Sequence, residues 1–304
     1  IIEYMCGIIG FTGRKPAKDI LIDGLERLEY RGYDSAGIAL LNDDDTLTIR
    51  KKAGRVSELR ELCKDGDYSS TCGIGHTRWA THGGVTDANA HPHRCGNVAL
   101  IHNGIIENYS DIIREYGLAD KLVSETDSEV VAALLDTLYD GDPIAAIRKA
   151  VKIIAGSFAL CIMFADRPGI IYAVRNVSPM VAAHSEEGSI IASDLTAIIS
   201  FSKDYFVVPE YHILTMTQEG IRVEDLKGNE VKPQMLEITW DITAAQKGGF
   251  PHFMLKEIYE QPESLRNTIT PRIVNSLPDF TEDGIDDEVF KNCENITVIA
   301  CGTA

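Results

Sequence analysis

A thiol at the start of a short apolar run is the side chain in this sequence with the clearest chemical potential. Cys6 directly follows Met5 and opens the stretch CGIIGF. If processing makes Cys6 the first residue, its own α-amine lies beside its sulfur. That amine has a pKa of about 7.7 to 8.0, close to the pKa of a thiol, so one residue could supply both a nucleophile and its base. Because a small cysteine in an apolar strand is more often a packing residue, this hypothesis depends on the rest of the chain.

Residues 72–108 contain a second concentration of reactive side chains. Five of the eight histidines lie here, at positions 76, 82, 91, 93 and 102, together with Arg78, Trp79 and Asn103. Glycines at 73, 75, 83, 84, 96 and 104 are interspersed with them, and no long amphipathic helix fits the stretch. We therefore expect loops that form a binding pocket.

Two shorter stretches carry polar groups that could join such a pocket. Residues 29–37 read EYRGYDSAG and place Arg31 between two tyrosines in a loop. Residues 126–129 read TDSE, which has the form of a capping box and predicts a helix over residues 128–139. Asp127 then lies in a first helical turn, where backbone N–H groups favour an ionised carboxylate.

The elements that must position these groups change character along the chain. Hydrophobic periodicity predicts helices over residues 16–30, 56–63 and 143–154, and a hairpin of strands over 38–41 and 47–51. From residue 157 strands dominate, over 158–164, 170–174, 180–183, 190–192, 205–208, 212–216 and 221–223. Because helices and strands do not alternate, a Rossmann sheet is disfavoured. The pattern favours an α+β fold with antiparallel sheets sandwiched by helices.

Composition and charge exclude several classes of partner. The chain has 304 residues, of which 44% are hydrophobic, and 46 acidic against 29 basic residues give a net charge of -17. Such a charge repels nucleic acid and anionic membranes, and we find neither a membrane span nor a signal peptide. Seven cysteines without a C-x-x-C pair are typical of reduced thiols, so we expect a cytoplasmic protein.

The last quarter of the chain has a different composition. Residues 229–250 show no period and contain Pro233, Gly248 and Gly249, which predicts a linker. Helices are expected over residues 252–261 and 264–268, and a strand over 295–300 that runs into a Gly-Thr turn. We expect residues 251–304 to be the truncated start of a second domain.

Several long motifs occur together in one order. They are CGIIG at Cys6, EYRGYDSAG at Glu29, HTRWATHG at His76, NAHPH at Asn89, HNGIIEN at His102, SETDSE at Ser124 and ASD at Ala192. On these motifs the chain resembles the glutamine-dependent amidotransferases of the N-terminal nucleophile class. The resemblance implies a four-layer αββα sandwich of two antiparallel sheets between helices, a leader over residues 1–5 and a glutaminase domain over 6–228.

The resemblance also implies a chemistry. Cys6 would attack the side-chain amide of glutamine and form a thioester, with release of ammonia and then of glutamate. Its α-amine would be the base. The Asn103 side chain and the Gly104 N–H would stabilise the oxyanion, and losing one such donor typically slows turnover about a hundredfold to a thousandfold. No cofactor is implied.

Further residues would bind the substrate in the same family pattern. Arg78 would bind the α-carboxylate, a two-pronged task that suits guanidinium, and Asp127 would bind the α-ammonium. Thr81 and His82 would line the pocket, Trp79 would lie on a mobile loop over it, and Arg31 would order that loop or the wall of the site.

The tail selects among relatives. MLKEIYEQP at Met254 and IACGTA at Ile299 resemble members whose second half is a sugar-phosphate isomerase. Fructose 6-phosphate would then be a substrate only through that missing domain, and the full-length protein is expected to be a homodimer.

Three alternatives stay open. One is the glutaminase domain of an amidophosphoribosyltransferase. A second is a zinc-binding module, because His91, His93 and Cys95 form H-x-H-x-C, although this spacing fits no standard zinc site. The third is a non-catalytic glutamine-binding module, if Cys6 is not N-terminal. Whether His91 and His93 are functional or structural is likewise open.

Overall fold

The computed structural model describes residues 6–66, 68–80, 83–239, 249–250, 252–295 and 297. These residues fall into two compact units, which divide near residue 240. The larger unit contains all the predicted site residues that the structure describes.

One sheet of the larger unit has eight antiparallel strands in the order β14-β11-β9-β10-β1-β4-β2-β3. The strands are β1 Gly7–Gly13, β2 Ser35–Leu41, β3 Leu47–Ala53, β4 Cys72–Arg78, β9 Val181–Ser185, β10 Gly188–Ala192, β11 Asp204–Val207 and β14 Leu236–Glu237. Its central strand β1 is apolar on both faces, because Ile8 packs into one core and Ile9 and Phe11 into another. A strand of this kind must be covered on both sides.

The second sheet has six antiparallel strands in the order β13-β12-β8-β7-β6-β5. Its strands are β5 His93–Cys95, β6 Val98–Ile106, β7 Gly156–Phe164, β8 Ile171–Asn176, β12 His212–Thr217 and β13 Gly220–Asp225. The strands predicted from residue 157 onward are confirmed.

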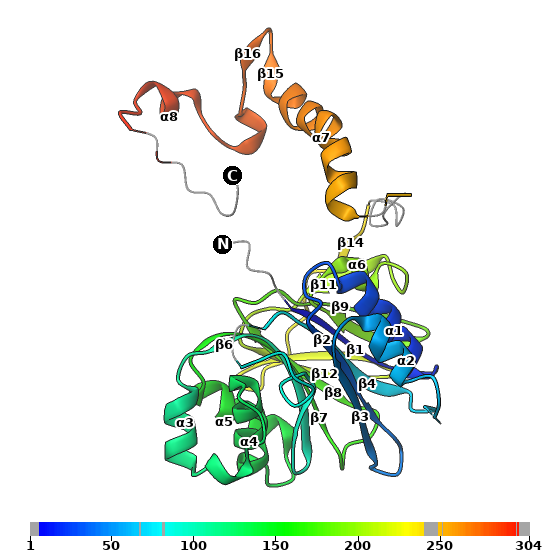
Figure 1. The fold of residues 1–304 in the computed structure, drawn as a ribbon. Coiled ribbons are helices and arrows are strands. Elements are labelled where there is room, and N and C mark those ends of the chain that lie inside the picture. The colour runs from blue at the N-terminus through cyan, green and yellow to red at the C-terminus, as the bar shows by residue number, and fades with distance from the viewer. Residues whose placement is uncertain are drawn as a thin grey trace. The chain divides into compact units, whose positions relative to one another are not determined.

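Helices cover the outer face of each sheet (Figure 1). The eight-stranded sheet carries α1 Ala17–Leu28, α2 Val56–Leu62 and α6 Leu195–Ile198, and the six-stranded sheet carries α3 Tyr109–Tyr116, α4 Asp127–Leu138 and α5 Pro143–Ile153. A third core, with Ile74 and Ile101 among its residues, lies between the two sheets. The predicted four-layer αββα sandwich is therefore confirmed.

The prediction of loops throughout residues 72–108 was wrong, because β4 and β6 run through this stretch. The glycines explain the error. A Cβ at Gly73 would lie 2.6 Å from the Ala39 carbonyl oxygen, and a Cβ at Gly75 would lie 3.2 Å from both Ile9 and Leu25. These glycines allow β2 and α1 to pack closely on β4, rather than marking turns.

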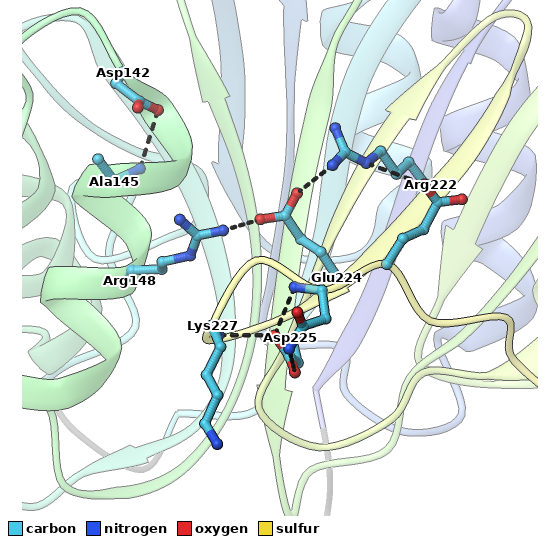
Figure 2. Close-up of polar contacts among 9 residues, drawn as sticks. Asp142, Ala145, Arg148, Arg222, Glu224, Asp225 and Lys227 are labelled. Atoms are coloured by element: carbon cyan, nitrogen blue, oxygen red, sulfur yellow. Dashed lines mark hydrogen bonds and ion pairs between the residues drawn. The ribbon is translucent and has the colours of Figure 1, made fainter.

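A buried carboxylate fastens the edge of the second sheet to a helix. Glu224 of β13 is 3% exposed and accepts a hydrogen bond from the Arg148 guanidinium of α5, while Arg222 approaches its other oxygen at 3.4 Å. Figure 2 shows Glu224 between the two arginines. The charge is compensated on both sides, as a buried carboxylate requires.

The smaller unit is described from residue 249. Its main element is the helix α7 Phe253–Ile269, followed by α8 Asp287–Lys291 and a hairpin of β15 Ile273–Val274 and β16 Leu277–Pro278. The prediction of two separate helices was wrong. The helix α7 passes through Pro262 and forgoes the hydrogen bond that this residue cannot donate.

The last residues of the chain are described only in part. The strand expected over residues 295–300 lies largely outside the described residues. The linker over residues 229–250 stays a prediction, although Leu236 and Glu237 within it pair with β11. Within the described part of the chain, no helix is long and apolar enough to cross a membrane.

Candidate active site

Cys6 lies immediately before β1, at the end of the sheet where β4 finishes. The antiparallel register sets Gly7 opposite Thr77, and the Gly7 N–H donates to Thr77 Oγ1 at 3.2 Å. Pairing of these strands therefore brings Cys6 to the segment that follows Thr77. There, the Trp79 N–H donates to Cys6 Sγ at 3.2 Å, and Sγ approaches the Trp79 carbonyl oxygen at 3.6 Å.

The environment of the sulfur keeps it protonated. Burial raises the pKa of the Cys6 thiol, and the Asp34 carboxylate raises it further. The Trp79 N–H and the Arg78 guanidinium lower the pKa but do not outweigh burial. A reaction at this sulfur therefore needs a group that removes its proton.

Asn103 and Gly104 reach the same place from the second sheet, near the end of β6. Asn103 Nδ2 donates to the Cys6 carbonyl oxygen at 2.8 Å. Gly104 has φ of +131°, and a Cβ at this position would lie 2.0 Å from the Ser157 carbonyl oxygen of β7. Only glycine fits this backbone, and Gly104 lines the same cavity as Cys6.

Asp127 is the first residue of α4, as its capping motif predicted. Thr126 is the N-cap and accepts from the Glu129 N–H, but the Glu129 carboxylate accepts from the N–H groups of Val123 and Ser124 instead of that of Thr126. Asp127 is 6% exposed, and its Oδ2 accepts from the Ile106 N–H at 2.8 Å. This bond ties the start of the helix to the end of β6.

Arg78 is the last residue of β4 and is 4% exposed. Its guanidinium donates to the carbonyl oxygens of Gly84 at 3.1 Å and Gly83 at 3.4 Å. Asn89 fixes the same turn, because its Nδ2 donates to the Gly84 carbonyl oxygen at 3.0 Å. The planar donors of Arg78 are thus held at the edge of a small cavity.

This cavity collects most of the predicted site. Its volume is about 20 Å³, and its lining consists of Cys6, Arg78, Trp79, His91, His102, Gly104, Thr126, Asp127 and Ser128. Four of these had no predicted site role: His102, Thr126 and Ser128, and His91, whose role was left open. Their positions beside Asn103, Asp127 and His93 were the available signal.

Two other predicted residues that the structure describes, Asn103 and Arg31, do not line the cavity. Asn103 lies against Cys6 but is not among the lining residues. Arg31 pairs with Asp194 at 2.9 Å, and Asp194 also caps α6. Arg31 therefore ties its own loop to the sheet that carries Cys6. Thr81 and His82 lie outside the described residues.

The loop that carries Trp79 is held by contacts with Tyr33 and Asp34. The Ala80 N–H donates to the Asp34 carboxylate, and the Asp34 N–H donates to the Arg78 carbonyl oxygen at 3.0 Å. The Trp79 ring meets the Tyr33 ring edge-on, with centroids 5.3 Å apart. The tyrosine-rich loop of residues 29–37 thus supports the residues beside the sulfur.

Three buried histidines lie against one another next to the site, and His91 among them lines the cavity. The rings of His76 and His91 stack at 4.0 Å, and His93 meets His91 edge-on at 4.6 Å. Burial lowers the pKa of His76 to about 3 and holds the pKa values of His91 and His93 well below their usual range. These rings are therefore neutral at physiological pH.

The H-x-H-x-C residues point to different partners. His91 Nδ1 accepts from the His102 N–H at 3.2 Å, His93 Nε2 contacts Thr126 Oγ1 at 3.0 Å, and Cys95 Sγ lies 3.9 Å from an Asp136 oxygen. Among the described residues, no group of three histidine, cysteine or acidic side chains could hold a metal ion.

Comparison with known proteins gives consistent matches. A family model for a glutamine amidotransferase domain matches residues 76–200. The chain is 42% identical over 306 residues to a glutamine–fructose-6-phosphate aminotransferase (isomerizing) of Clostridium acetobutylicum, and 43% identical over 303 residues to the protein of the same name from Thermus thermophilus. Each match covers 99% of this chain and 50% of the relative, so the chain spans about half the length of these curated relatives.

A solved structure shares the fold. It is the glutamine phosphoribosylpyrophosphate amidotransferase from B. subtilis complexed with ADP and GMP. The likeness covers 74% of this chain and 50% of that chain, with a TM-score of 0.63 and 24% sequence identity.

Proposed function

Because this chain belongs to the glutamine amidotransferases, we propose that residues 6–228 form a glutaminase domain that hydrolyses the side-chain amide of glutamine to glutamate and ammonia. One observation carries the proposal. The Cys6 sulfur, the Arg78 guanidinium and the Asp127 carboxylate, which come from separate parts of the chain, line one cavity. A thiol that shares a cavity with a cation and an anion matches an α-amino acid whose side chain carries the reacting carbonyl.

In the proposed reaction, Cys6 Sγ attacks the amide carbon while its proton moves to the Cys6 α-amine. The carbonyl oxygen becomes an oxyanion, and Asn103 Nδ2 and the Gly104 N–H stabilise it. The α-ammonium returns the proton to the departing nitrogen, which leaves as ammonia. Water then attacks the thioester, the carbon–sulfur bond breaks, and the thiol is restored as glutamate leaves.

The α-amine is proposed as the base because three neighbouring imidazoles are poorly suited to the task. Burial lowers the pKa values of His76, His91 and His93, which disfavours the imidazolium that a base must become. A terminal amine titrates near pH 8, within reach of physiological conditions. The role requires that Cys6 be the first residue, and residues 1–5 lie outside the described part of the chain.

Substrate entry requires the site to open. A cavity of about 20 Å³ has room for roughly one water molecule and not for glutamine. We propose that the loop that carries Trp79 moves to admit substrate. Arg78 then exchanges the carbonyl oxygens of Gly83 and Gly84 for the α-carboxylate of glutamine, and Asp127 receives the α-ammonium.

We further propose that the ammonia serves a second half of a longer protein. In that half, fructose 6-phosphate would be aminated to glucosamine 6-phosphate, and the whole protein would be a cytoplasmic homodimer. The relatives that share 42% and 43% identity carry this activity in their name. An amidophosphoribosyltransferase is less well supported, because the solved structure of that type is only 24% identical.

The test compares three proteins: one that begins at Cys6, one that retains residues 1–5, and Cys6→Ala in the first form. We expect the first to release one ammonia and one glutamate per glutamine. Retention of residues 1–5 should slow hydrolysis about a hundredfold to ten thousandfold, the usual contribution of a general base. Cys6→Ala should abolish hydrolysis and labelling by an electrophilic glutamine analogue.

The outcomes separate the parts of the proposal. Equal rates with and without residues 1–5 would refute the role of the α-amine but not that of the thiol. Glutamine binding without hydrolysis by the form that begins at Cys6 would favour a non-catalytic binding module. Undiminished hydrolysis in Cys6→Ala would remove the nucleophile from the mechanism.

A further inference from the structure

The imidazole of His76 contacts the side chain that is proposed to stabilise the oxyanion. His76 lies on β4 and is 1% exposed. Its Nε2 atom lies 3.0 Å from the His102 main-chain oxygen and 3.0 Å from Asn103 Oδ1. One ring nitrogen of the first sheet thus meets two oxygens of the second.

These contacts fix the proton on the ring. A main-chain carbonyl oxygen can only accept, so His76 Nε2 must carry hydrogen and donate to the His102 oxygen. The Asn103 atom that faces the same N–H must then be an acceptor, which identifies it as Oδ1.

The other end of the Asn103 amide leads independently to the same orientation. It faces the Cys6 main-chain oxygen at 2.8 Å, and this oxygen also can only accept. The atom that faces it must therefore be Nδ2. If the amide were reversed, its NH₂ group would oppose the His76 N–H, and its oxygen would oppose the Cys6 oxygen. Both hydrogen bonds would then be replaced by repulsive contacts.

The ring itself is held in place and is neutral. It stacks on His91 with 13° between the ring planes. Burial lowers its pKa to about 3, so it presents the same N–H across the physiological range. His76 Nδ1 is buried and has no hydrogen-bond partner among the residues that the structure describes. Burial of an unpaired ring nitrogen is unfavourable. The contact with Asn103 is a reason for a histidine at this position.

We propose that His76 is a positioning residue that holds the Asn103 amide with Nδ2 directed at Cys6, ready for the oxyanion. This inference rests on the proposed glutaminase function. The unused hydrogen of Nδ2 is then preset before substrate arrives, which is the condition under which an oxyanion donor is most effective.

The test uses the chain that begins at Cys6 and removes only the N–H donor. His76→Phe keeps a ring for stacking but cannot donate to Asn103, whereas His76→Gln restores an N–H at a similar distance from the backbone. We expect His76→Phe to lower kcat for glutamine hydrolysis about tenfold to a hundredfold, within the range for a weakened oxyanion donor. KM should change less than about threefold, and His76→Gln should recover most of kcat. His184→Phe, at an exposed histidine outside the cavity, is the matched control.

A double-mutant cycle distinguishes positioning from general damage to the fold. In an Asn103→Leu background, His76→Phe should lower kcat less than about twofold, because its effect acts through Asn103. The same fold-loss in both backgrounds would overturn the proposal, as would an unchanged kcat in His76→Phe alone.

A readout that does not depend on activity separates this inference from the proposed function. In protein with ¹⁵N-labelled asparagine, the two side-chain amide protons of Asn103 should shift or broaden in His76→Phe and return in His76→Gln. Unchanged resonances in His76→Phe would overturn the inference. If the form that begins at Cys6 did not hydrolyse glutamine at all, the proposed function would fail, and the resonances would still report whether His76 holds the amide.

Discussion

Replacing Gly104 by alanine should disturb stability and catalysis together, because this residue of the second sheet lines the cavity that Cys6 also lines. At φ of +131° a residue other than glycine is strained whatever its surroundings. The added Cβ would also lie 2.0 Å from the Ser157 carbonyl oxygen and 2.7 Å from the Ser157 carbonyl carbon. Both atoms are main chain, so β6 and β7 would have to separate.

Each effect has a known size. A residue forced into a sparsely populated backbone region costs about 1 to 3 kcal/mol, and overpacking costs about as much again. We therefore expect Gly104→Ala to lower the free energy of unfolding by about 2 to 6 kcal/mol. For a domain of this size, that corresponds to a fall in Tm of at least about 4 °C.

Two glycines serve as controls. Gly117 also has a positive φ, of +63°, but no atom of the described residues lies within 4 Å of an added Cβ, so Gly117→Ala measures backbone strain without the clash. At Gly84 the φ is not strained, and an added Cβ would again meet no atom of the described part of the chain within 4 Å, so Gly84→Ala should leave Tm nearly unchanged. The order of Tm loss should be Gly104→Ala, then Gly117→Ala, then Gly84→Ala.

The assays are thermal unfolding of the 304-residue chain and glutamine hydrolysis by the form that begins at Cys6. A shift of about 1 Å in the Gly104 N–H could lower kcat about a hundredfold in the surviving folded protein. If Gly104→Ala unfolded no earlier than Gly117→Ala, the clash with Ser157 would not exist as described, and the reasoning would be refuted.

Three further predictions concern charge and protonation. Glu224→Gln should lower the free energy of unfolding of the larger unit by about 1 to 3 kcal/mol, as measured by urea unfolding. The effect is smaller than for a fully buried ion pair because Arg148 is 29% exposed. Glu230→Gln, at the surface, is the control, and an equal effect there would contradict the prediction. In the chain that retains residues 1–5, the rate of Cys6 alkylation by iodoacetamide should keep rising above pH 8.5, because burial raises the pKa of this thiol. The rate is measured from the labelled peptide. A plateau below pH 8 would contradict the raised pKa. The pKa of His76 is about 3 in the folded chain and about 6.5 in the unfolded chain, so between these pH values only the unfolded chain binds a proton at His76. The free energy of unfolding therefore falls as the pH drops, by about 2 kcal/mol at pH 5. In His76→Phe, the difference in unfolding free energy between pH 7 and pH 5 should be smaller.

Local chemistry made some of the site predictable from sequence. Thr126 and Glu129 mark a helix start by their spacing, and the structure begins α4 at Asp127 with Thr126 as its N-cap. Such signals operate within one helical turn, so no knowledge of the fold is needed to read them. The same holds for α1, whose apolar period alone predicts its buried face.

The rest of the site depends on contacts between residues far apart in the chain, which the sequence does not reveal. Arg31 is a plausible substrate-binding residue by type and neighbours, yet its partner Asp194 lies 163 positions away in the chain. The misread glycines at 73 and 75 have the same cause. Glycine usually marks a turn, and only the approach of α1 and β2 to β4 shows why it is needed within a strand. A pattern read along one segment carries no information on what packs against that segment.

The buried histidines connect the fold to the choice of base. They lie where the two sheets meet, and an imidazolium there would lack solvation, so burial keeps His76, His91 and His93 neutral. A neutral ring can hold an amide or a hydroxyl in one orientation, as His76 holds Asn103 and His93 contacts Thr126. It is a weak acceptor for the proton of a thiol whose own pKa burial has raised. The environment that suits these rings to positioning therefore makes them unsuitable as the base. This supports the proposal that, in a chain that begins at Cys6, the α-amine of the same residue takes the proton of the thiol.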